Sequence, residues 1–265
     1  MTRLYPAIMK YWRQQRGMSQ LDLAVAAEIS TRHVSFLETG RAQPSRDMVL
    51  RLAAALDLPL REQNSMLSAA GFGPAFEEPK FDGGLTPQVE QVLARMFAQH
   101  EPFPLVVVNR GYDMLRANHG ARRLLARFIA EPEAASGQLN VLRLLFDPRL
   151  GRRFVVDWER VAHLLLTRLH REALARPSDD IAANLLRELC SYPDLPSDWR
   201  QPDFSTPSEP ALVLHLRRDD LDVRFLATIT TFNAPQNVTL EELRIDSYFP
   251  LDERTEETCK RLARP

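Results

Sequence analysis

STRHVSFLETGR, residues 30–41, is the stretch that decides the fold of the N-terminal part of this chain. It opens with polar residues and stops at a Thr-Gly-Arg corner. Val34, Phe36 and Leu37 are expected to point inward, which is the pattern of a short amphipathic helix. The preceding stretch SQLDLAVAAEI, residues 19–29, predicts another short helix that opens on a capping serine.

Two helices joined by so tight a turn form a helix-turn-helix, whose second helix enters the major groove of DNA. The exposed residues at the start of that helix reach the base edges, and Arg32 can donate two hydrogen bonds to one guanine. We expect Gln20 and Arg41 to lie along the phosphates, and Glu38 to be structural because phosphates would repel its carboxylate. The expected DNA contacts are Gln20, Ser30, Thr31, Arg32, His33, Ser35 and Arg41.

The distribution of charge agrees with a nucleic-acid partner at one end of the chain. Residues 1–46 carry seven Lys or Arg and three Asp or Glu, a net charge of +4. Because the whole chain carries −1, the remaining residues carry −5. A basic module at one end suits a polyanion such as double-stranded DNA. One short helix reads about four base pairs, so we expect a homodimer on a palindromic operator.

Apolar spacing and stop signals predict an all-α N-terminal domain of five helices, the helix-turn-helix domain, over residues 1–73. Besides the two helices above, we expect one at residues 6–16, one after Ser45 and one at residues 60–70. Gly and Pro then punctuate the chain without any period, which is typical of a domain boundary. We therefore assign residues 74–101 to a linker and a connecting helix.

Residues 102–265 predict a domain in which helices and an antiparallel sheet are combined. Two apolar runs flank Asn109-Arg110-Gly111, which is the signal of a β-hairpin. Apolar residues at helical spacing follow, and alternation from Leu212 onward predicts more strands. Strands at both ends with helices between them predict an α+β fold in which one antiparallel sheet carries a helical insertion.

Both domains resemble known families. RQQRGMSQLDLA, ISTRHVSFLETGR and PSRDMVLRLAAAL, within residues 6–73, resemble the xenobiotic-response-element, or lambda repressor/Cro-type, helix-turn-helix family. LVVVNRGYDMLRAN, NVLRLLFDP with the run after it, and TLEELRIDSYFPLDE, within residues 102–258, resemble the MmyB-like ligand-binding domain of bacterial regulators. The second resemblance implies a PAS-like fold that binds a small apolar effector, such as a fatty acid. Together the resemblances imply a regulator of transcription, which we expect to be a repressor.

A PAS-like fold would place the ligand pocket between the inner face of the sheet and the helices that cover it. Two candidates are polar, and a buried polar group needs a partner. A ligand carboxylate would satisfy Arg143, and so would an internal ion pair with Asp147 or Asp157. The other candidates are apolar or aromatic. The expected ligand contacts are Leu115, Asn118, Leu142, Arg143, Leu145, Phe146, Trp158, Leu165, Leu214 and Phe225.

Other classes of function have less support in the sequence. It contains no P-loop, nucleophile elbow or dinucleotide motif, and Lys80 and Lys260 are poorly placed for a self-cleaving Ser–Lys repressor. Cys190 and Cys259 lie far apart, and we expect neither a metal nor a cofactor. Without a signal peptide or a long apolar run, we expect a cytoplasmic protein that has no membrane contact and is not an enzyme. The alternative is an antitoxin-type regulator that binds a protein and no small molecule.

Overall fold

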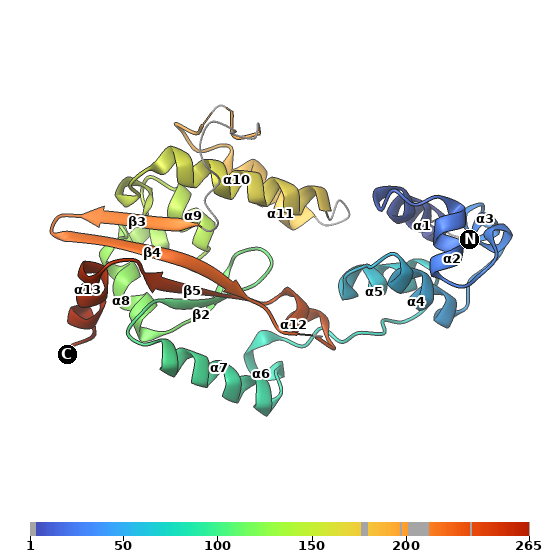
Figure 1. Ribbon diagram of the computed structural model, residues 1–265, viewed down its shortest axis with the longest axis horizontal. Helices are drawn as coiled ribbons and strands as arrows, with labels where there is room; N and C mark the ends of the chain where they lie inside the picture. The colour runs from blue at the N-terminus through green and yellow to red at the C-terminus, as the bar shows by residue number, and fades with distance from the viewer. Residues whose placement is uncertain (1–3, 176–179, 197, 201–211, 234, 265) are drawn as a thin grey trace. The chain divides into compact units, whose positions relative to one another are not determined.

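The computed structural model describes residues 4–175, 180–196, 198–200, 212–233 and 235–264, which fold into two compact units (Figure 1). The first unit consists of Met1–Gly84 and Phe232–Glu241, and the second of Leu85–Thr231 and Glu242–Pro265. Each unit has its own core of buried apolar side chains.

The first unit contains short helices whose first turns are capped by serine side chains. The Ser19 hydroxyl accepts a hydrogen bond from Asp22 N at 3.1 Å, and the Asp22 carboxylate accepts one from Ser19 N at 2.7 Å. Ser30 and Ser45 cap the next two helices. Over residues 4–69 the helices match the five that the sequence predicts: α1 (Leu4–Gln15), α2 (Gln20–Ala26), α3 (Thr31–Glu38), α4 (Arg46–Ala55) and α5 (Leu60–Ala69).

These helices enclose the first core. Val34 and Leu37 of α3 are fully buried, as the sequence predicts. The expectation that Phe36 also points inward is wrong: the side chain is half-buried and lies under the Arg32 guanidinium, 5.1 Å from the ring centroid. Successive residues of a helix are rotated by about 100°, so Phe36 faces away when its neighbours face the core. Other buried side chains of this core include Tyr5, Met9, Trp12, Leu23, Val49, Leu52, Leu56, Met66 and Leu67.

The segment that follows α5 packs against the first unit. The Asn64 side chain of α5 accepts a hydrogen bond from Phe76 N at 3.1 Å and donates one to Phe76 O at 2.8 Å. Further along, Val238 N donates to Glu77 O at 2.9 Å. Residues 74–84, which the sequence assigns to a linker, therefore lie in the first unit because side chains and backbone of distant segments hold them. Two short helices belong to this region: α6 (Phe81–Gly84) and α12 (Val238–Glu242).

The second unit is built on one antiparallel sheet. Within the described residues its strand order is β2-β1-β5-β4-β3, and every neighbouring pair is antiparallel. The hairpin predicted around Asn109-Arg110-Gly111 joins β1 to β2. The strands are β1 (Leu105–Val108), β2 (Met114–Ala117), β3 (Val213–Arg218), β4 (Leu221–Thr230) and β5 (Arg244–Pro250).

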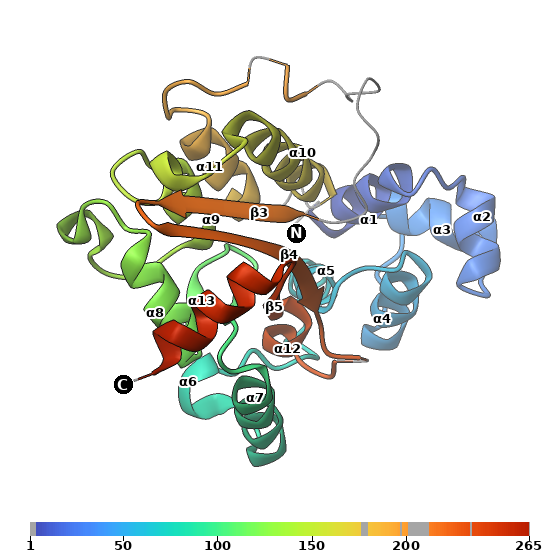
Figure 2. The ribbon, with the colours of Figure 1, turned by 60° about the vertical axis from the view of Figure 1, so that its left-hand side comes forward.

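Between β2 and β3 the chain forms the predicted helical insertion. It contains α8 (His119–Arg127), η1 (Pro132–Ala135), α9 (Val141–Phe146), η2 (Arg152–Phe154), α10 (Trp158–Ala175) and α11 (Asp180–Leu189). We call the face of the sheet toward α9 and α10 the inner face (Figures 1 and 2). The outer face is covered by α7 (Pro87–His100), where Glu90 accepts a hydrogen bond from Arg116 of β2 at 2.6 Å. The last helix, α13 (Glu253–Ala263), packs against α8 and β4.

Candidate functional sites

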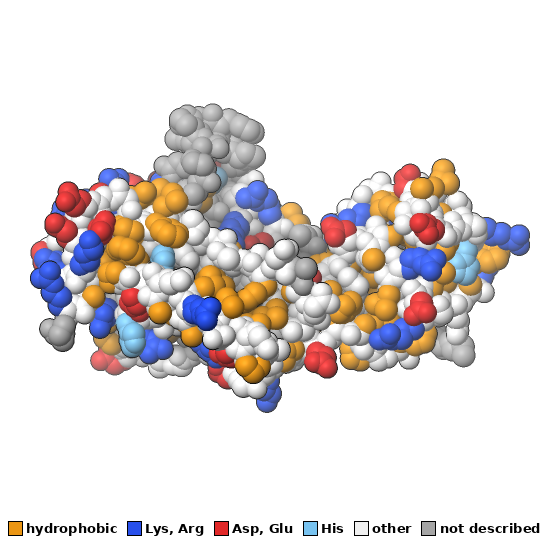
Figure 3. Space-filling model, turned by 60° about the horizontal axis from the view of Figure 1, so that its bottom comes forward, with side chains coloured by type: hydrophobic (Ala, Val, Ile, Leu, Met, Phe, Trp, Pro, Cys, Tyr) orange, Lys and Arg blue, Asp and Glu red, His pale blue; other side chains and the backbone are white. Residues whose placement is uncertain are grey.

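The N-terminal end of α3 presents the side chains that the sequence assigns to DNA. Arg32 and Arg41 are exposed, and Thr31, His33 and Ser35 are half-buried. Because the Arg32 guanidinium rests on the Phe36 ring, it is held at the helix surface in a limited range of positions. Figure 3 shows several Lys and Arg side chains on the first unit, at the right of the view, with Asp and Glu side chains among them. This surface suits hydrogen bonds to base edges and phosphates.

Two of the expected DNA contacts have structural roles. The Ser30 hydroxyl accepts a hydrogen bond from His33 N at 3.2 Å and so caps α3. The Gln20 amide in the first turn of α2 donates a hydrogen bond to Glu38 Oε2 at 2.7 Å and so fastens α2 to α3. Contact of either residue with DNA stays a prediction.

Glu38 is structural, as expected, and fastens α3 to α1. Its side chain is 3% exposed, and Arg13 donates to its two oxygens at 2.6 and 3.2 Å. Burial alone would raise the pKa of Glu38, but hydrogen bonds from Arg13 and Gln20 hold it below its ordinary value. The carboxylate therefore stays charged and keeps both partners at neutral pH.

The turn between α2 and α3 contains a strained residue. Glu28 has φ of 53°, in the left-handed region that residues with a Cβ rarely occupy. Replacing Glu28 with glycine should therefore raise the free energy of unfolding by about 1 kcal/mol, because glycine occupies this region without strain. Chemical denaturation measures the change. Glu28→Ala is the matched control, since it removes the same carboxylate but keeps the Cβ; an equal gain in both variants would show that charge and not strain is responsible.

An apolar cavity of about 70 Å³ lies on the inner face of the second unit. Side chains from the sheet, α8 and α9 line it, and they are almost all aliphatic or aromatic. A cavity lined in this way suits an apolar molecule. The principal lining residues are Pro104, Val106, Met114, Leu124, Leu125, Phe128, Val141, Leu144, Leu145, Leu214, Leu216, Phe225 and Tyr248.

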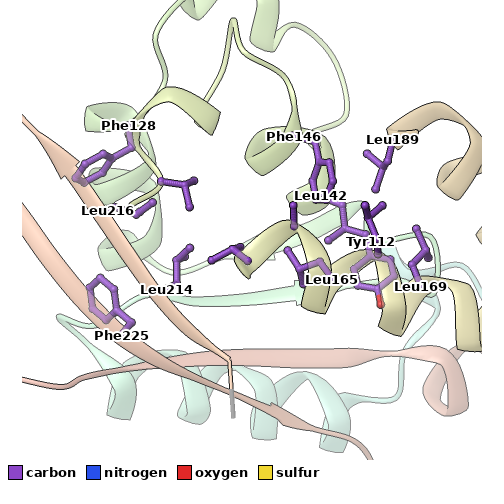
Figure 4. Packing of buried hydrophobic residues seen from close by; sticks show 14 of the residues in the cluster. Tyr112, Phe128, Leu142, Phe146, Leu165, Leu169, Leu189, Leu214, Leu216 and Phe225 are labelled. Carbon is purple, nitrogen blue, oxygen red and sulfur yellow. The ribbon is translucent and has the colours of Figure 1, made fainter. Parts of the chain in front are cut away.

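Three of the expected ligand contacts, Leu145, Leu214 and Phe225, line this cavity. Others are buried elsewhere in the same core: Figure 4 shows Leu142, Phe146 and Leu165 among the helices, away from Phe128, Leu214, Leu216 and Phe225 near the strands. Trp158 packs edge-on against Phe146 with ring centroids 4.9 Å apart. Leu142, Phe146, Trp158 and Leu165 therefore pack in the hydrophobic core between helices and do not line the cavity.

Leu115 is half-buried and does not line the cavity, whereas its neighbour Met114 does. The register of β1 against β2 shifts between Val107 and Val108. A slip of one residue exchanges the faces to which the side chains of a strand point. The expectation for Leu115 is therefore wrong by one position, and the alternation of the sequence gives no sign of the shift.

The two polar candidates are satisfied within the protein. Asn118 caps α8 by accepting a hydrogen bond from Ala121 N at 2.8 Å, and it also donates to Phe103 O at 2.8 Å. The Arg143 guanidinium forms a bidentate pair with Glu188 of α11, at 2.7 and 2.8 Å. Neither Asp147 nor Asp157, the partners that the sequence suggests, is used. Because its charge is already paired, Arg143 is not the group that would hold a ligand carboxylate.

A partly buried polar cluster that the sequence analysis missed lies beside the cavity. We define the polar cluster as Tyr112, Arg168, Glu172, Arg244 and Asp246. Glu172 of α10 accepts hydrogen bonds from the Tyr112 hydroxyl at 3.0 Å and from Arg168 Nε at 3.1 Å. It also pairs with Arg244 Nη2 at 3.1 Å. The alternation of Arg244, Asp246 and Tyr248 along β5 is the sequence signal that could have revealed the cluster.

Two atoms of the polar cluster lack a partner. Arg244 Nη1 and Asp246 Oδ1 are buried and have no hydrogen-bond partner among the described residues. An unpaired buried polar group costs about 1–3 kcal/mol, so a site that keeps two of them has a reason to do so. Burial raises the pKa of Asp246 to about 6, although Arg168 and Arg244 act in the opposite direction.

The raised pKa of Asp246 predicts a dependence of stability on pH. Between about pH 4 and pH 6 the folded state holds a proton that the unfolded state releases, so the free energy of unfolding falls as the pH rises. Asp246→Asn should therefore raise the free energy of unfolding at pH 7.5 by on the order of 2 kcal/mol, and by much less at pH 4.5. Urea denaturation at both pH values measures this. The exposed Asp220→Asn is the control, and equal gains at the two pH values would contradict the assignment.

Two comparisons with protein families agree with this geometry. The model described as MmyB-like transcription regulator ligand binding domain matches residues 89–262, about two thirds of the chain. The chain belongs to this family. A second model, described as helix-turn-helix, matches residues 9–63, which span α2 and α3. The protein is therefore a helix-turn-helix transcription regulator with a C-terminal MmyB-like, PAS-like ligand-binding domain.

Individual relatives were also compared. The HTH-type transcriptional regulator DdrOP3 of Deinococcus deserti is 30% identical over 94 residues, which are 32% of this chain and 73% of the relative. The solved structure of an RNA-binding light-oxygen-voltage receptor aligns with 99% of this chain at 15% identity and a TM-score of 0.29. That score is too low to support an argument, and this chain covers 64% of the receptor chain.

The described residues contain no group of three or more His, Cys, Asp or Glu side chains placed to hold a metal ion. No helix among them is both long enough and apolar enough to cross a bilayer.

Proposed function

We propose that the protein is a repressor that binds a palindromic operator as a homodimer and responds to a small apolar effector. The observation that carries the proposal is the pairing of an exposed arginine surface at α3 with an apolar cavity in the family's ligand-binding domain. The proposed site of action is the cytoplasm, where the operator lies. We propose no catalytic step for either site.

Recognition of the operator rests on the N-terminal end of α3. Arg32 donates to a guanine from its position over Phe36, and Thr31 and His33 add weaker contacts to base edges. Arg41 follows the helix and contacts the backbone of the duplex. Two copies of α3, one from each protomer, would read half-sites one helical turn apart, about 34 Å between their centres.

The effector would occupy the apolar cavity. Its volume of about 70 Å³ is roughly half that of an engineered cavity that binds benzene, about 150 Å³. A larger molecule, such as a fatty acyl chain, must therefore push lining side chains of α8 and α9 apart. Such a displacement would give the domain two conformations, one without the effector and one with it. Regulation requires this, because an effector shifts an equilibrium only when it binds the two states with different affinities.

Filling the cavity tests this function. Leu145→Trp should abolish the response to the effector and leave operator affinity unchanged, because Leu145 lines the cavity of the second unit and the indole would occupy the space. The measurement is the fluorescence anisotropy of a labelled operator duplex, with and without the small molecule that native mass spectrometry finds on the purified protein. Leu164→Trp is the matched control, because Leu164 is 38% exposed on α10. A loss of response in both variants, or a normal response in Leu145→Trp, would contradict the proposal.

A further inference from the structure

The inner face of β5 joins the apolar cavity to the polar cluster. Tyr248 lines the cavity, and Asp246 lies two residues earlier on the same face, about 7 Å along the strand. Val106 of β1, another lining residue, is the direct cross-strand partner of Asp246. Arg244 follows at the next inward position, opposite Val108. Neither Asp246 nor Arg244 lines the cavity, so an occupant reaches them only by extending along β5 past the lining residues.

The unpaired atoms at this end form one donor and one acceptor. Arg244 Nη1 can donate a hydrogen bond, and Asp246 Oδ1 can accept one. Other groups of the cluster are engaged: Arg244 Nη2 and Arg168 Nε with Glu172, and the Tyr112 hydroxyl with the same carboxylate. The Arg244 guanidinium also lies over the Tyr112 ring, 4.9 Å from its centroid. These contacts hold the cluster in place, while Arg244 Nη1 and Asp246 Oδ1 are buried without a partner among the described residues.

The charges of the polar cluster balance without a ligand. Arg168 and Arg244 are positive, Glu172 and Asp246 are acidic, and all four interact with one another. A ligand carboxylate would add a negative charge next to Asp246, which repels it, and it has no proton to give to Oδ1. A group that both accepts and donates, without a charge of its own, satisfies both atoms.

We propose that Arg244 and Asp246 form the polar end of the effector site and select an apolar molecule that ends in an uncharged group able to accept and donate hydrogen bonds. A primary amide is the best match, since its oxygen accepts from Arg244 and its nitrogen donates to Asp246; a hydroxyl group is the simpler alternative of the same class. This inference rests on the proposed function, because it assumes that the apolar part of the molecule occupies the cavity.

Isothermal titration calorimetry of the whole chain at pH 7.5 tests the inference with octanamide, 1-octanol and octanoate. The three probes share an apolar chain and differ in the end group. Wild-type protein should bind octanamide and octanol at least tenfold more tightly than octanoate. Asp246→Asn, which removes the repelling charge, should shift the preference at least tenfold toward octanoate. Arg244→Lys keeps the charge beside Glu172 but loses Nη1, and it should weaken octanamide binding at least tenfold.

Two control variants make the result specific. Ser247→Ala changes the neighbouring residue of β5, on the other face, and should leave the preference unchanged. Arg143→Gln should not alter octanoate binding, because Arg143 is paired with Glu188 outside the cavity lining. If wild type binds the three probes with equal affinity, and Asp246→Asn does so too, the inference about the polar end is wrong. That result would leave the proposal of an apolar effector site intact. Binding of none of them, or binding that Leu145→Trp leaves unchanged, would overturn the apolar effector site and the inference with it.

Discussion

Arg32→Ala should weaken operator binding by about 2–6 kcal/mol for the proposed dimer, since each lost bidentate contact to guanine costs about 1–3 kcal/mol. The loss should be confined to one base pair in each half-site: the variant should bind the operator and an operator substituted at that pair equally well. Anisotropy titrations of wild type and variant against both duplexes measure the effect. The stacking of Arg32 on Phe36 is the physical reason, because a guanidinium that is already held at the helix surface loses little freedom on binding.

Arg41→Ala is the matched comparison, since it removes the same charge from an exposed position after α3. As a phosphate contact, Arg41 should contribute the same binding free energy to every DNA sequence. Its loss should reduce the slope of log affinity against log salt concentration by about one for each copy of Arg41. A uniform loss in Arg32→Ala, with the same change in salt slope, would assign Arg32 to the phosphates. Unchanged affinity would remove it from the binding surface.

Glu38→Ala should lower the free energy of unfolding of the first unit by about 3–5 kcal/mol, because it leaves the Arg13 guanidinium buried without its partner. It also releases the Gln20 amide, so that α1, α2 and α3 all lose a common contact. Hydrogen exchange followed by mass spectrometry measures this for each unit separately, and faster exchange is expected in α1–α5, which share one core, and not in the second unit. Operator binding should fall with the population of folded helix-turn-helix.

The double variant Arg13→Met/Glu38→Leu separates the cost of an unpaired charge from the value of the pair. Replacing both partners by apolar side chains of similar size is often neutral, so most of the stability should return. If the double variant is as unstable as Glu38→Ala, the pair itself stabilises the unit, and the interpretation of a stranded Arg13 is wrong.

The helix-turn-helix was predictable because its signals are local. Ser19 and Ser30 act on backbone groups three residues away, and the spacing of Val34 and Leu37 reports a helix face directly. The role of Gln20 was not predictable in the same way. Its amide reaches Glu38, eighteen positions later, and no local pattern reports such a contact.

The sheet and its helical insertion were also predictable, since two apolar runs around a turn signal mark β1 and β2, and alternation marks β3. The cavity was predicted only in part, with Leu145, Leu214 and Phe225 in its lining. Whether an apolar side chain borders a void or fills it depends on how elements distant in sequence pack, as Leu142 and Phe146 show by lying in solid core. A register shift, invisible in the sequence, misplaced Leu115.

The polar cluster was missed because its members come from separate parts of the chain. Arg244 and Asp246 are on β5, Glu172 is on α10, and Tyr112 follows β1. In the sequence each of them reads as an ordinary polar residue of a half-exposed element. Their burial and their shared contacts become visible only when β5 lies against α10.

The most direct test of the account is a titration of operator duplex, selected from random sequence, with ligand-free protein and again with the octyl compound that binds most tightly. Addition of the compound should change the operator affinity of the wild type at least tenfold. Leu145→Trp should bind the same duplex with equal affinity with and without the compound. Selection of no preferred duplex, or the same wild-type affinity with and without the compound, would contradict the account.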